Sequence, residues 1–345
     1  MNRRYFLMST AAAPGLALGG SVPSPNDTIR AAVIGTGYLG RFHAQKYAKL
    51  PNAELLFCVD ADLERARDAA AGTGAAAVTD YRAILGKVEA VSIAVPTPAH
   101  HAVAKDCLAA GLDILLEKPV TTTVAEADEL IELARSKGRV FMAGHLERFN
   151  PPIMRLRNSL IKPAFIQAER LGPFKERAAN IDVVIDLMIH DLDIVLSFVK
   201  SSISRISAVG LPVLSDKVDI ANARLEFENG AVANLTASRV SVGEGVRKIK
   251  IFQHESYTSI DYGAQKMAVF TLGPGDRSNP MSRIRIEEVA LDRQDALENE
   301  VRAFLRSVAD RSTPPVTGEE GRRALDVALK ILERIGRTPR PEDLD

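Results

Sequence analysis

The segment Ile29-Arg30-Ala31-Ala32-Val33-Ile34-Gly35-Thr36-Gly37-Tyr38-Leu39-Gly40 decides the fold of this chain. Its first six residues predict a short buried strand, and the next six carry a G-x-G-x-x-G pattern that opens a helix expected to reach about Leu50. The first glycine allows a tight turn, the second lets the backbone approach a pyrophosphate, and the third lets helix and strand pack closely. The pattern predicts a dinucleotide site at a helix N-terminus, made by Gly35, Gly37, Tyr38, Leu39 and Gly40.

Strands and helices alternate from this loop to about residue 150. Further strands are expected at 54–60, 90–95, 113–117 and 140–143, and helices at 62–71, 100–110 and 124–137. Such alternation is typical of βαβ units around a parallel sheet, with the carboxyl ends of the strands along one ligand-binding edge. We therefore expect residues 28–150 to form a doubly wound Rossmann domain in an α/β protein.

The pattern changes after Asn150-Pro151-Pro152. One strong helix is expected at 183–199, then strands at 205–209, 219–227, 231–238, 246–252, 258–262 and 284–291, and closing helices at 296–310 and 319–337. Strands that follow one another without helices predict a mostly antiparallel sheet. Residues 151–345 are therefore expected to form an α+β domain with an open sheet for substrate binding and oligomerisation. Its C-terminal helices can pack back on the Rossmann domain.

Composition excludes several classes of protein. The 44 lysines and arginines balance the 44 aspartates and glutamates, which argues against nucleic-acid binding through an overall positive charge. Cys58 and Cys107 lie in apolar runs and are expected to be packed thiols, so neither a disulfide framework nor a metal site is predicted. The sequence contains no run of about 20 apolar residues, so no membrane span is predicted.

Residues 1–27 are set apart from the fold. Arg3-Arg4 precede Tyr5-Phe6-Leu7, and an alanine-rich stretch and a Pro/Ser/Asn linker follow. This order resembles a twin-arginine export signal, which favours export to the periplasm. The alternatives are a disordered extension or a wrongly assigned start codon.

Asp60 ends the second predicted strand, 25 positions after Gly35. A carboxylate at this place accepts the hydroxyl hydrogens of the adenosine ribose and repels a 2′-phosphate. The residue therefore favours NAD over NADP as cofactor.

Two further segments carry candidate chemistry. Glu117-Lys118-Pro119 places a lysine directly after a buried strand, at the ligand-binding edge. Burying a lysine costs free energy, so a lysine beside a cofactor site often has a functional role. Asp186 and His190 stand four residues apart in a predicted helix and share a face, so the carboxylate can orient the imidazole as an acid or base. A surface lysine and a satisfied core histidine are the alternative interpretations.

The glycine loop, Glu117-Lys118-Pro119 and Asp186-x-x-x-His190, in this order, resemble the Gfo/Idh/MocA family of sugar and inositol dehydrogenases. The likeness extends over about residues 29–337. It implies that Lys118 and His190 flank a sugar hydroxyl beside the nicotinamide, and that one of them removes its proton. It also implies a place near the cofactor for Glu117 and for Pro96, Thr97 and His100 of the stretch Pro96-Thr97-Pro98-Ala99-His100.

A narrower likeness concerns the substrate. Gly144-His145-Leu146-Glu147-Arg148-Phe149-Asn150-Pro151 and the stretch 182–191 resemble the branch of the family that oxidises C3 of UDP-N-acetylglucosamine, as in the route to amide-linked lipid A. Arg148, Asn150, Arg170 and Arg177 are then candidates for the substrate site, with the arginines facing the pyrophosphate. Surface or hinge ion pairs are the alternative for each arginine.

Three functions stay open at this point. The first is an NAD-dependent dehydrogenase of a UDP-sugar, which implies a cytoplasmic enzyme. The second is an exported oxidoreductase that retains NAD(P) and acts on a non-nucleotide sugar or polyol. The third is a cofactor-binding protein without turnover, which the presence of Lys118, Asp186 and His190 argues against. The resemblance also implies a homodimer or homotetramer packed sheet to sheet.

Overall fold

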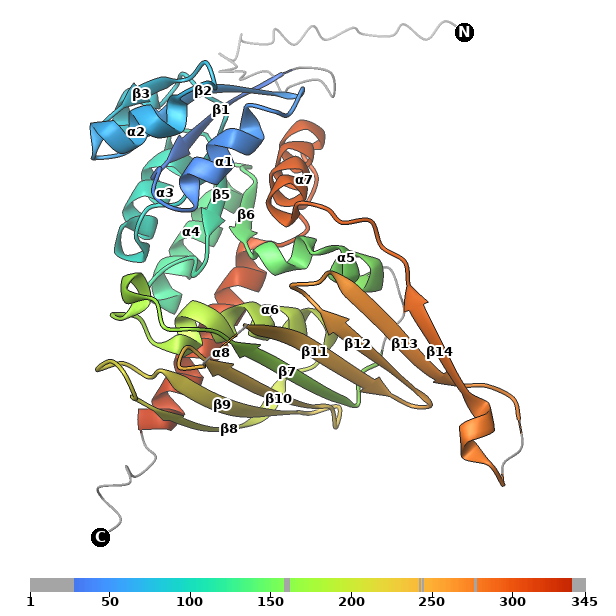
Figure 1. Cartoon of the computed structure of the whole chain (residues 1–345). Coiled ribbons are helices and arrows are strands. Elements are labelled where there is room, and N and C mark those ends of the chain that lie inside the picture. The colour runs from blue at the N-terminus through green and yellow to red at the C-terminus, as the bar shows by residue number, and fades with distance from the viewer. Residues whose placement is uncertain (1–27, 158–161, 242, 244, 276–277, 337–345) are drawn as a thin grey trace, which may run out of the picture.

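A six-stranded parallel sheet, in the order β3-β2-β1-β4-β5-β6, builds the N-terminal domain (Figure 1). The structure is a computed structural model, and it describes residues 28–157, 162–241, 243, 245–275 and 278–336. The strands are β1 (Ile29–Ile34), β2 (Ala53–Val59), β3 (Ala76–Val78), β4 (Ala90–Ile93), β5 (Asp113–Glu117) and β6 (Phe141–Gly144). The helices are α1 (Gly40–Tyr47), α2 (Leu63–Ala70), η1 (Tyr81–Ile84), η2 (Thr97–Ala99), α3 (His100–Ala109), α4 (Val124–Ser136), η3 (Leu146–Phe149) and α5 (Pro151–Arg157). The predicted Rossmann architecture is confirmed.

An eight-stranded, mostly antiparallel sheet builds the second domain, in the order β14-β13-β12-β11-β7-β10-β9-β8. Its strands are β7 (Phe165–Leu171), β8 (Ile203–Leu211), β9 (Ile220–Phe227), β10 (Val232–Ser238), β11 (Val246–Gln253), β12 (Ser256–Asp261), β13 (Lys266–Leu272) and β14 (Ile284–Val289). The other elements are η4 (Glu176–Ala178), η5 (Val184–Met188), α6 (Ile189–Phe198), η6 (Pro280–Arg283), α7 (Ala296–Asp310) and α8 (Gly318–Gly336).

Sequence periodicity missed the strands β3, β7 and β13. β3 has only three small residues, and β7 interleaves Ile166 and Ala168 with polar side chains and the charged Arg170. β7 nevertheless lies in the middle of the sheet, parallel to β10 and antiparallel to β11. The predicted helix 183–199 is also two segments, because the π-helical turn η5 precedes α6.

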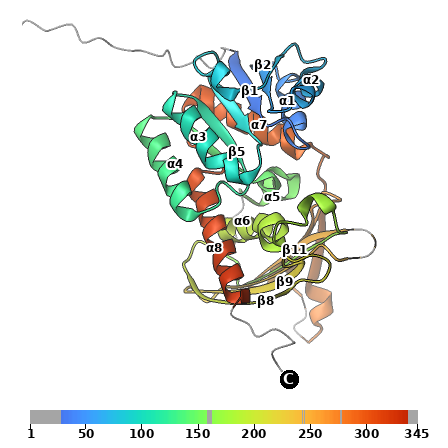
Figure 2. The same ribbon diagram turned by 90° about the vertical axis from the view of Figure 1, so that its left-hand side faces the viewer.

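One face of the large sheet is covered and the other is open (Figures 1 and 2). Alternate residues of β7 and β9 are buried against α6 and α8, whereas the residues between them are more exposed. The two closing helices connect the domains: α7 packs on α1, and α8 runs from α4 and β6 to α6 and β8. Phe304 and Leu305 of α7 belong to the Rossmann core, so the end of the chain completes the first domain.

A cluster of buried polar side chains lies between α1, β5 and α7. His43 Nε2 lies 3.1 Å from Glu117 Oε1, and His43 Nδ1 lies 3.1 Å from Ser92 Oγ. Glu300 of α7 faces the pair, and atoms of His43, Glu117 and Glu300 lie within 4.8 Å of one another. Both Glu300 oxygens are buried without a hydrogen-bond partner in the described part of the chain. Burial, reinforced by the charge of Glu117, raises the pKa of Glu300 well above its ordinary value.

We predict that Glu300→Gln stabilises the protein more at high pH than at low pH. The folded state keeps the proton above the ordinary pKa of 4.5, whereas the unfolded chain releases it. The wild type therefore loses about 1.4 kcal/mol of unfolding free energy per pH unit until the folded pKa is reached. Urea unfolding between about pH 5 and pH 8 measures this loss. Equal slopes for wild type and variant would contradict it, and Glu298→Gln, in the partly exposed first turn of α7, is the control.

The glycine loop offers a second test. A Cβ built on Gly40 would lie 1.8 Å from the Gly35 carbonyl oxygen, whereas one built on Gly37 has no atom within 4 Å. We expect Gly40→Ala to lower the free energy of unfolding by about 2 kcal/mol or more. Gly37→Ala should leave thermal unfolding unchanged but weaken NADH binding in a fluorescence titration, because its methyl group occupies the place of the pyrophosphate. Equal loss of stability in both variants would contradict this division.

Candidate active site

A cleft of about 480 Å³ opens at the carboxyl edge of the parallel sheet, where the Rossmann domain meets η5 and α8. Leu39 of the glycine loop, Pro96 and Thr97 after β4, and Lys118 after β5 line one side. The facing side is apolar and is lined by Ile181, Ile185, Leu325 and Leu329. A crevice beyond the carboxyl ends of the strands is where α/β proteins of this class bind their ligands.

The glycine loop and Asp60 have the features of a dinucleotide site. Gly35 adopts a φ of +85°, and its N–H donates to the Val59 carbonyl at 2.7 Å, which brings the loop beside the end of β2. Asp60 Oδ2 accepts the Thr36 N–H at 2.8 Å, and its Oδ1 accepts the Asp62 N–H at 3.0 Å. The open space at Gly37 and the N-terminus of α1 fit a pyrophosphate. Tyr38 is 59% exposed and packs edge-on against Phe42.

His100 and Glu117 both line the cleft, and both are also bonded within the protein. His100 is buried, and its ring nitrogens lie 2.8 Å from the Pro119 carbonyl and 2.9 Å from the Val95 carbonyl. It thereby ties together the loops that follow β4 and β5. The Glu117 carboxylate is paired with His43, so Glu117 connects the lining of the cleft to α1.

Lys118 stands at the junction of the two domains. Its Nζ donates to the Asp186 carbonyl at 2.7 Å and lies 3.7 Å from Asp186 Oδ1. Its side chain is only 17% exposed. Burial, joined by the positive charge of Arg170, lowers the pKa of Lys118, although Asp186 and Glu117 oppose the shift. A lowered pKa favours the neutral amine, which can accept a proton.

His190 lies in the first turn of α6, with its Nδ1 buried and without a hydrogen-bond partner in the described residues. Burial, together with the charges of Lys118 and Arg170, lowers the pKa of His190 well below its ordinary value. The imidazole is therefore neutral near pH 7 and can accept or donate one hydrogen bond to a bound hydroxyl.

The pairing expected between Asp186 and His190 is wrong. Both contacts that Asp186 makes through its carbonyl and carboxylate are with Lys118, which reaches it from β5. Asp186 lies in the π-helical η5 and His190 in α6, and Asp186 instead contacts the strand-end lysine, which brings a positive charge. Asp186 therefore orients the lysine.

The arginines expected to face a pyrophosphate are engaged elsewhere. Arg148 donates to Asp193 at 2.8 Å and Glu320 at 2.6 Å, and Arg170 donates to both oxygens of Asp191 and to Glu147. Both are buried, so each guanidinium needs these carboxylates to offset its lost hydration. The hinge ion-pair interpretation holds for Arg148 and Arg170.

Asn150 does not line the cleft either. Asn150 donates through its side-chain amide to Glu147 and the Tyr262 carbonyl, both at 3.2 Å, which makes it part of the same buried frame. The backbone of Arg177 lies in η4, and its side chain is outside the described part of the structure.

Sequence reasoning missed His145. The register of β5 and β6 pairs Glu117 with Gly144, so Lys118 and His145 follow side by side at the carboxyl edge. His145 is 1% exposed, and neither ring nitrogen has a hydrogen-bond partner among the described residues. Burial lowers the pKa of His145. Its place two residues after the predicted strand 140–143 was the available signal, similar to the strand-end position that identified Lys118.

The comparisons with known proteins agree with this geometry. Residues 29–145 match the oxidoreductase family with an NAD-binding Rossmann fold, and residues 166–255 match the GFO/IDH/MocA C-terminal domain. The chain is 41% identical over 304 residues to UDP-N-acetylglucosamine 3-dehydrogenase from Acidithiobacillus ferrooxidans, across 88% of this chain and 96% of the relative. A solved structure of that enzyme superposes with a TM-score of 0.84 at 40% identity, covering 89% of this chain and 97% of the other.

More distant proteins share the fold. A myo-inositol 2-dehydrogenase from Thermotoga maritima is 24% identical over 86% of this chain and 93% of its own length. Levoglucosan dehydrogenase in complex with NADH and levoglucosan has a TM-score of 0.79 at 20% identity, covering 90% and 98% of the two chains. With its Rossmann cleft, its strand-end lysine and its open second sheet, the chain belongs to the Gfo/Idh/MocA family of NAD-binding oxidoreductases, which act on CH–OH groups.

Proposed function

We propose that the protein is an NAD-dependent dehydrogenase that oxidises the C3 hydroxyl of UDP-N-acetylglucosamine, or of a closely related UDP-sugar, to a ketone. The observation that carries the reaction is the buried Lys118 amine, which lies at the cleft beside the Asp186 carbonyl. The substrate follows from 41% identity over nearly the whole chain to an enzyme named for this reaction.

The residues divide the work by position. The glycine loop and Asp60 would hold the dinucleotide, with the nicotinamide in the cleft between Thr97 and Ile185. When bound, NAD accepts a hydride from the sugar carbon. Lys118, whose pKa is lowered by burial, takes the hydroxyl proton in its neutral form, and Asp186 holds its Nζ in place.

His190 and His145 complete the site as neutral hydrogen-bonding groups for the sugar. His190 Nδ1 and both ring nitrogens of His145 have no hydrogen-bond partner in the described chain. A bound sugar can supply these hydrogen bonds. Burial, together with the charge that Lys118 carries when protonated, lowers the pKa of both imidazoles. A pH–rate profile therefore reports on the group of Lys118, His190 and His145 together.

Lysine 118 offers the direct test. We expect Lys118→Met to lower the rate of NADH formation with UDP-N-acetylglucosamine by about 10²–10⁴-fold, because a general base contributes on this scale. NADH binding, followed by fluorescence, should change little, since the glycine loop and Asp60 are untouched. In the wild type, the rate of sugar oxidation should rise with pH through a lysine pKa below its ordinary value.

Lys105→Met provides the matched control. Lys105 is an exposed lysine of α3 that pairs with Glu129, away from the cleft. Its substitution should leave the rate unchanged. An unchanged rate in Lys118→Met would rule out Lys118 as the base, and turnover of a free sugar but not of the UDP-sugar would overturn the proposed substrate.

The second candidate is an exported sugar or polyol oxidoreductase that retains its cofactor. The feature that favours it is Arg3-Arg4 with the aromatic and apolar residues that follow, in the segment 1–27 that lies outside the described residues. A UDP-sugar substrate instead favours a cytoplasmic enzyme, whose 3-keto product an aminotransferase of the lipid A route can use.

Among the described residues, no helix is long and apolar enough to cross a membrane.

The open face of the large sheet supports an oligomer. Phe165, Phe252, Tyr257 and Phe270 form a stacked row across β7, β11, β12 and β13, with ring centroids 5.6, 5.1 and 4.2 Å apart. Ile286 of β14 continues the row, and its side chain is 62% exposed. An apolar stripe of this kind marks a surface that another protein covers. We propose that a second copy of the chain packs there, sheet to sheet.

Ile286→Asp tests this interface. A buried unpaired carboxylate is costly at an apolar contact, so the variant should dissociate to a smaller species in size-exclusion chromatography with light scattering. Met154→Asp places the same charge on α5, away from the open face, and should keep the mass of the wild type. A wild type that is monomeric, or a variant with unchanged mass, would contradict the proposed interface.

A further inference from the structure

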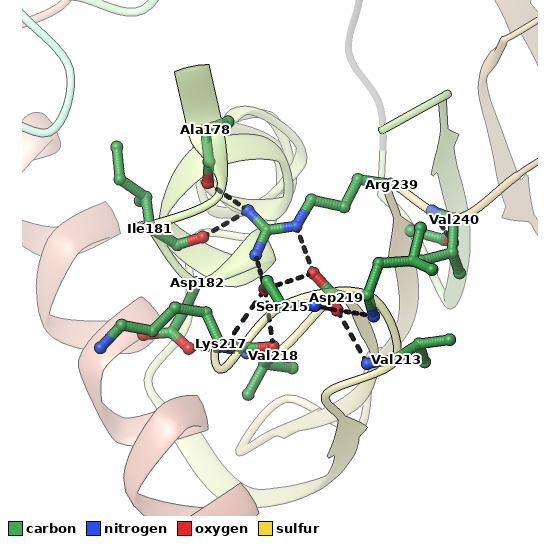
Figure 3. Close-up of polar contacts among 12 residues, drawn as sticks. Ala178, Ile181, Asp182, Val213, Ser215, Lys217, Val218, Asp219, Arg239 and Val240 are labelled. Atoms are coloured by element: carbon green, nitrogen blue, oxygen red, sulfur yellow. Dashed lines mark hydrogen bonds and ion pairs between the residues drawn. The ribbon is translucent and has the colours of Figure 1, made fainter. Parts of the chain in front are cut away.

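A buried arginine–aspartate pair lies next to residues 178–182, the turn that leads into η5 (Figure 3). Arg239 directly follows β10 and is 2% exposed, and Asp219 directly precedes β9 and is 0% exposed. Arg239 Nε donates to Asp219 Oδ1 at 2.6 Å, and the Arg239 backbone N–H donates to the Asp219 carbonyl at 2.9 Å. Neither residue lines the cleft, so the pair acts through other residues if it affects the reaction.

The Asp219 carboxylate organises the loop between β8 and β9. Its Oδ2 accepts the backbone N–H groups of Val213, Leu214 and Ser215 at 2.7, 2.6 and 2.8 Å, and Oδ1 accepts the Ser215 hydroxyl at 2.8 Å. Burial alone would raise the pKa of Asp219, but these hydrogen bonds and Arg239 hold it well below its ordinary value. The charged carboxylate therefore keeps the loop in one conformation.

Arg239 connects this loop to the chain that precedes η5. Its Nη1 donates to the carbonyls of Ala178 and Ile181, both at 2.5 Å, and its Nη2 donates to the Ser215 hydroxyl at 3.0 Å. The loop adds a second connection, because the Val218 N–H donates to Asp182 Oδ1 at 2.9 Å. Figure 3 shows the guanidinium between Asp219 on one side and the two carbonyls on the other.

The anchored residues lead directly into the site. The Asp182 carbonyl accepts the backbone N–H groups of Ile185 and Asp186, both at 3.0 Å, so the turn held by Arg239 starts η5. Ile181 and Ile185 form part of the apolar side of the cleft. The Asp186 carbonyl receives Lys118 Nζ two residues before the end of η5. Any shift of residues 178–183 therefore moves the partner of the lysine.

We propose that Arg239 is a positioning residue for the dehydrogenase reaction: it fixes the turn 178–183 and thereby holds the Asp186 carbonyl against Lys118. A guanidinium suits this place because its planar fork reaches one carboxylate, one hydroxyl and two carbonyls at once, which a lysine ammonium on a flexible chain cannot. The proposal rests on the proposed function for its kinetic readout, but the environment of Lys118 can be measured without any substrate.

Arg239→Lys tests the proposal, because it keeps the positive charge but removes the planar guanidinium with its several donors. Competitive acetylation followed by mass spectrometry measures the pKa of Lys118 in the folded protein. We expect it to rise by about half a pH unit or more, because burial is the main cause of its lowered value and a displaced η5 admits water. The charged or titratable groups that face Lys118, namely Glu117, Asp186, Arg170, His145 and His190, are all retained in this variant.

The same variant should be slower with UDP-N-acetylglucosamine. We expect kcat to fall by about tenfold and its rise with pH to move to higher pH, because less of the lysine is then neutral. Arg224→Lys is the matched control, since Arg224 is an exposed arginine of β9 paired with Glu226. If Arg239→Lys does not fold, Asp182→Ala removes the acceptor of the Val218 N–H instead and should shift the Lys118 pKa in the same direction.

The outcomes separate the two proposals. A lower free energy of unfolding with an unchanged Lys118 pKa and unchanged kcat would show that Arg239 only stabilises the fold, and would overturn the inference. A raised Lys118 pKa in Arg239→Lys, with a wild type that does not oxidise the UDP-sugar, would support the positioning role and overturn the proposed substrate. A raised pKa together with the slower, shifted kcat would support both.

Discussion

The contact between Lys118 Nζ and the Asp186 carbonyl joins the two domains at the point where the cleft opens. A buried amine that has lost most of its water needs a fixed hydrogen-bond partner. The second domain supplies it from η5. This one contact depends on three features of the fold. They are the position of β5, the packing of α7 against Glu117, and the hydrogen bonds that hold residues 178–183.

Buried arginines frame the same region. Arg148, Arg170 and Arg239 each meet at least one buried carboxylate, and their partners come from other parts of the chain. Buried ion pairs contribute little net stability, because the lost hydration cancels much of the attraction, but they restrict the arrangement of the elements that carry them. The charges of these arginines are satisfied inside the protein, which leaves Lys118, His190 and His145 as the groups that the proposed substrate would contact.

The path of the chain couples the packing of the two domains. α7 fills the core of the first domain, and α8 crosses from α4 to the covered face of the large sheet. Residues distant in sequence therefore determine the width of the cleft, as Leu325 and Leu329 of α8 face Pro96 and Thr97. The open face of the sheet, on the opposite side, stays accessible to a partner (Figure 2).

The sequence by itself determined the Rossmann domain, the glycine loop with Asp60, and the strand-end lysine, because each depends on a local pattern of a few neighbouring residues. It did not reveal β7, whose alternation is obscured by the buried Arg170. Only the tertiary structure decided which carboxylate meets which cation: Arg148 pairs with Glu320, 172 residues away, and Asp186 with Lys118, 68 residues away. Charge compensation in a buried site depends on distance in space, and a single sequence does not contain those distances.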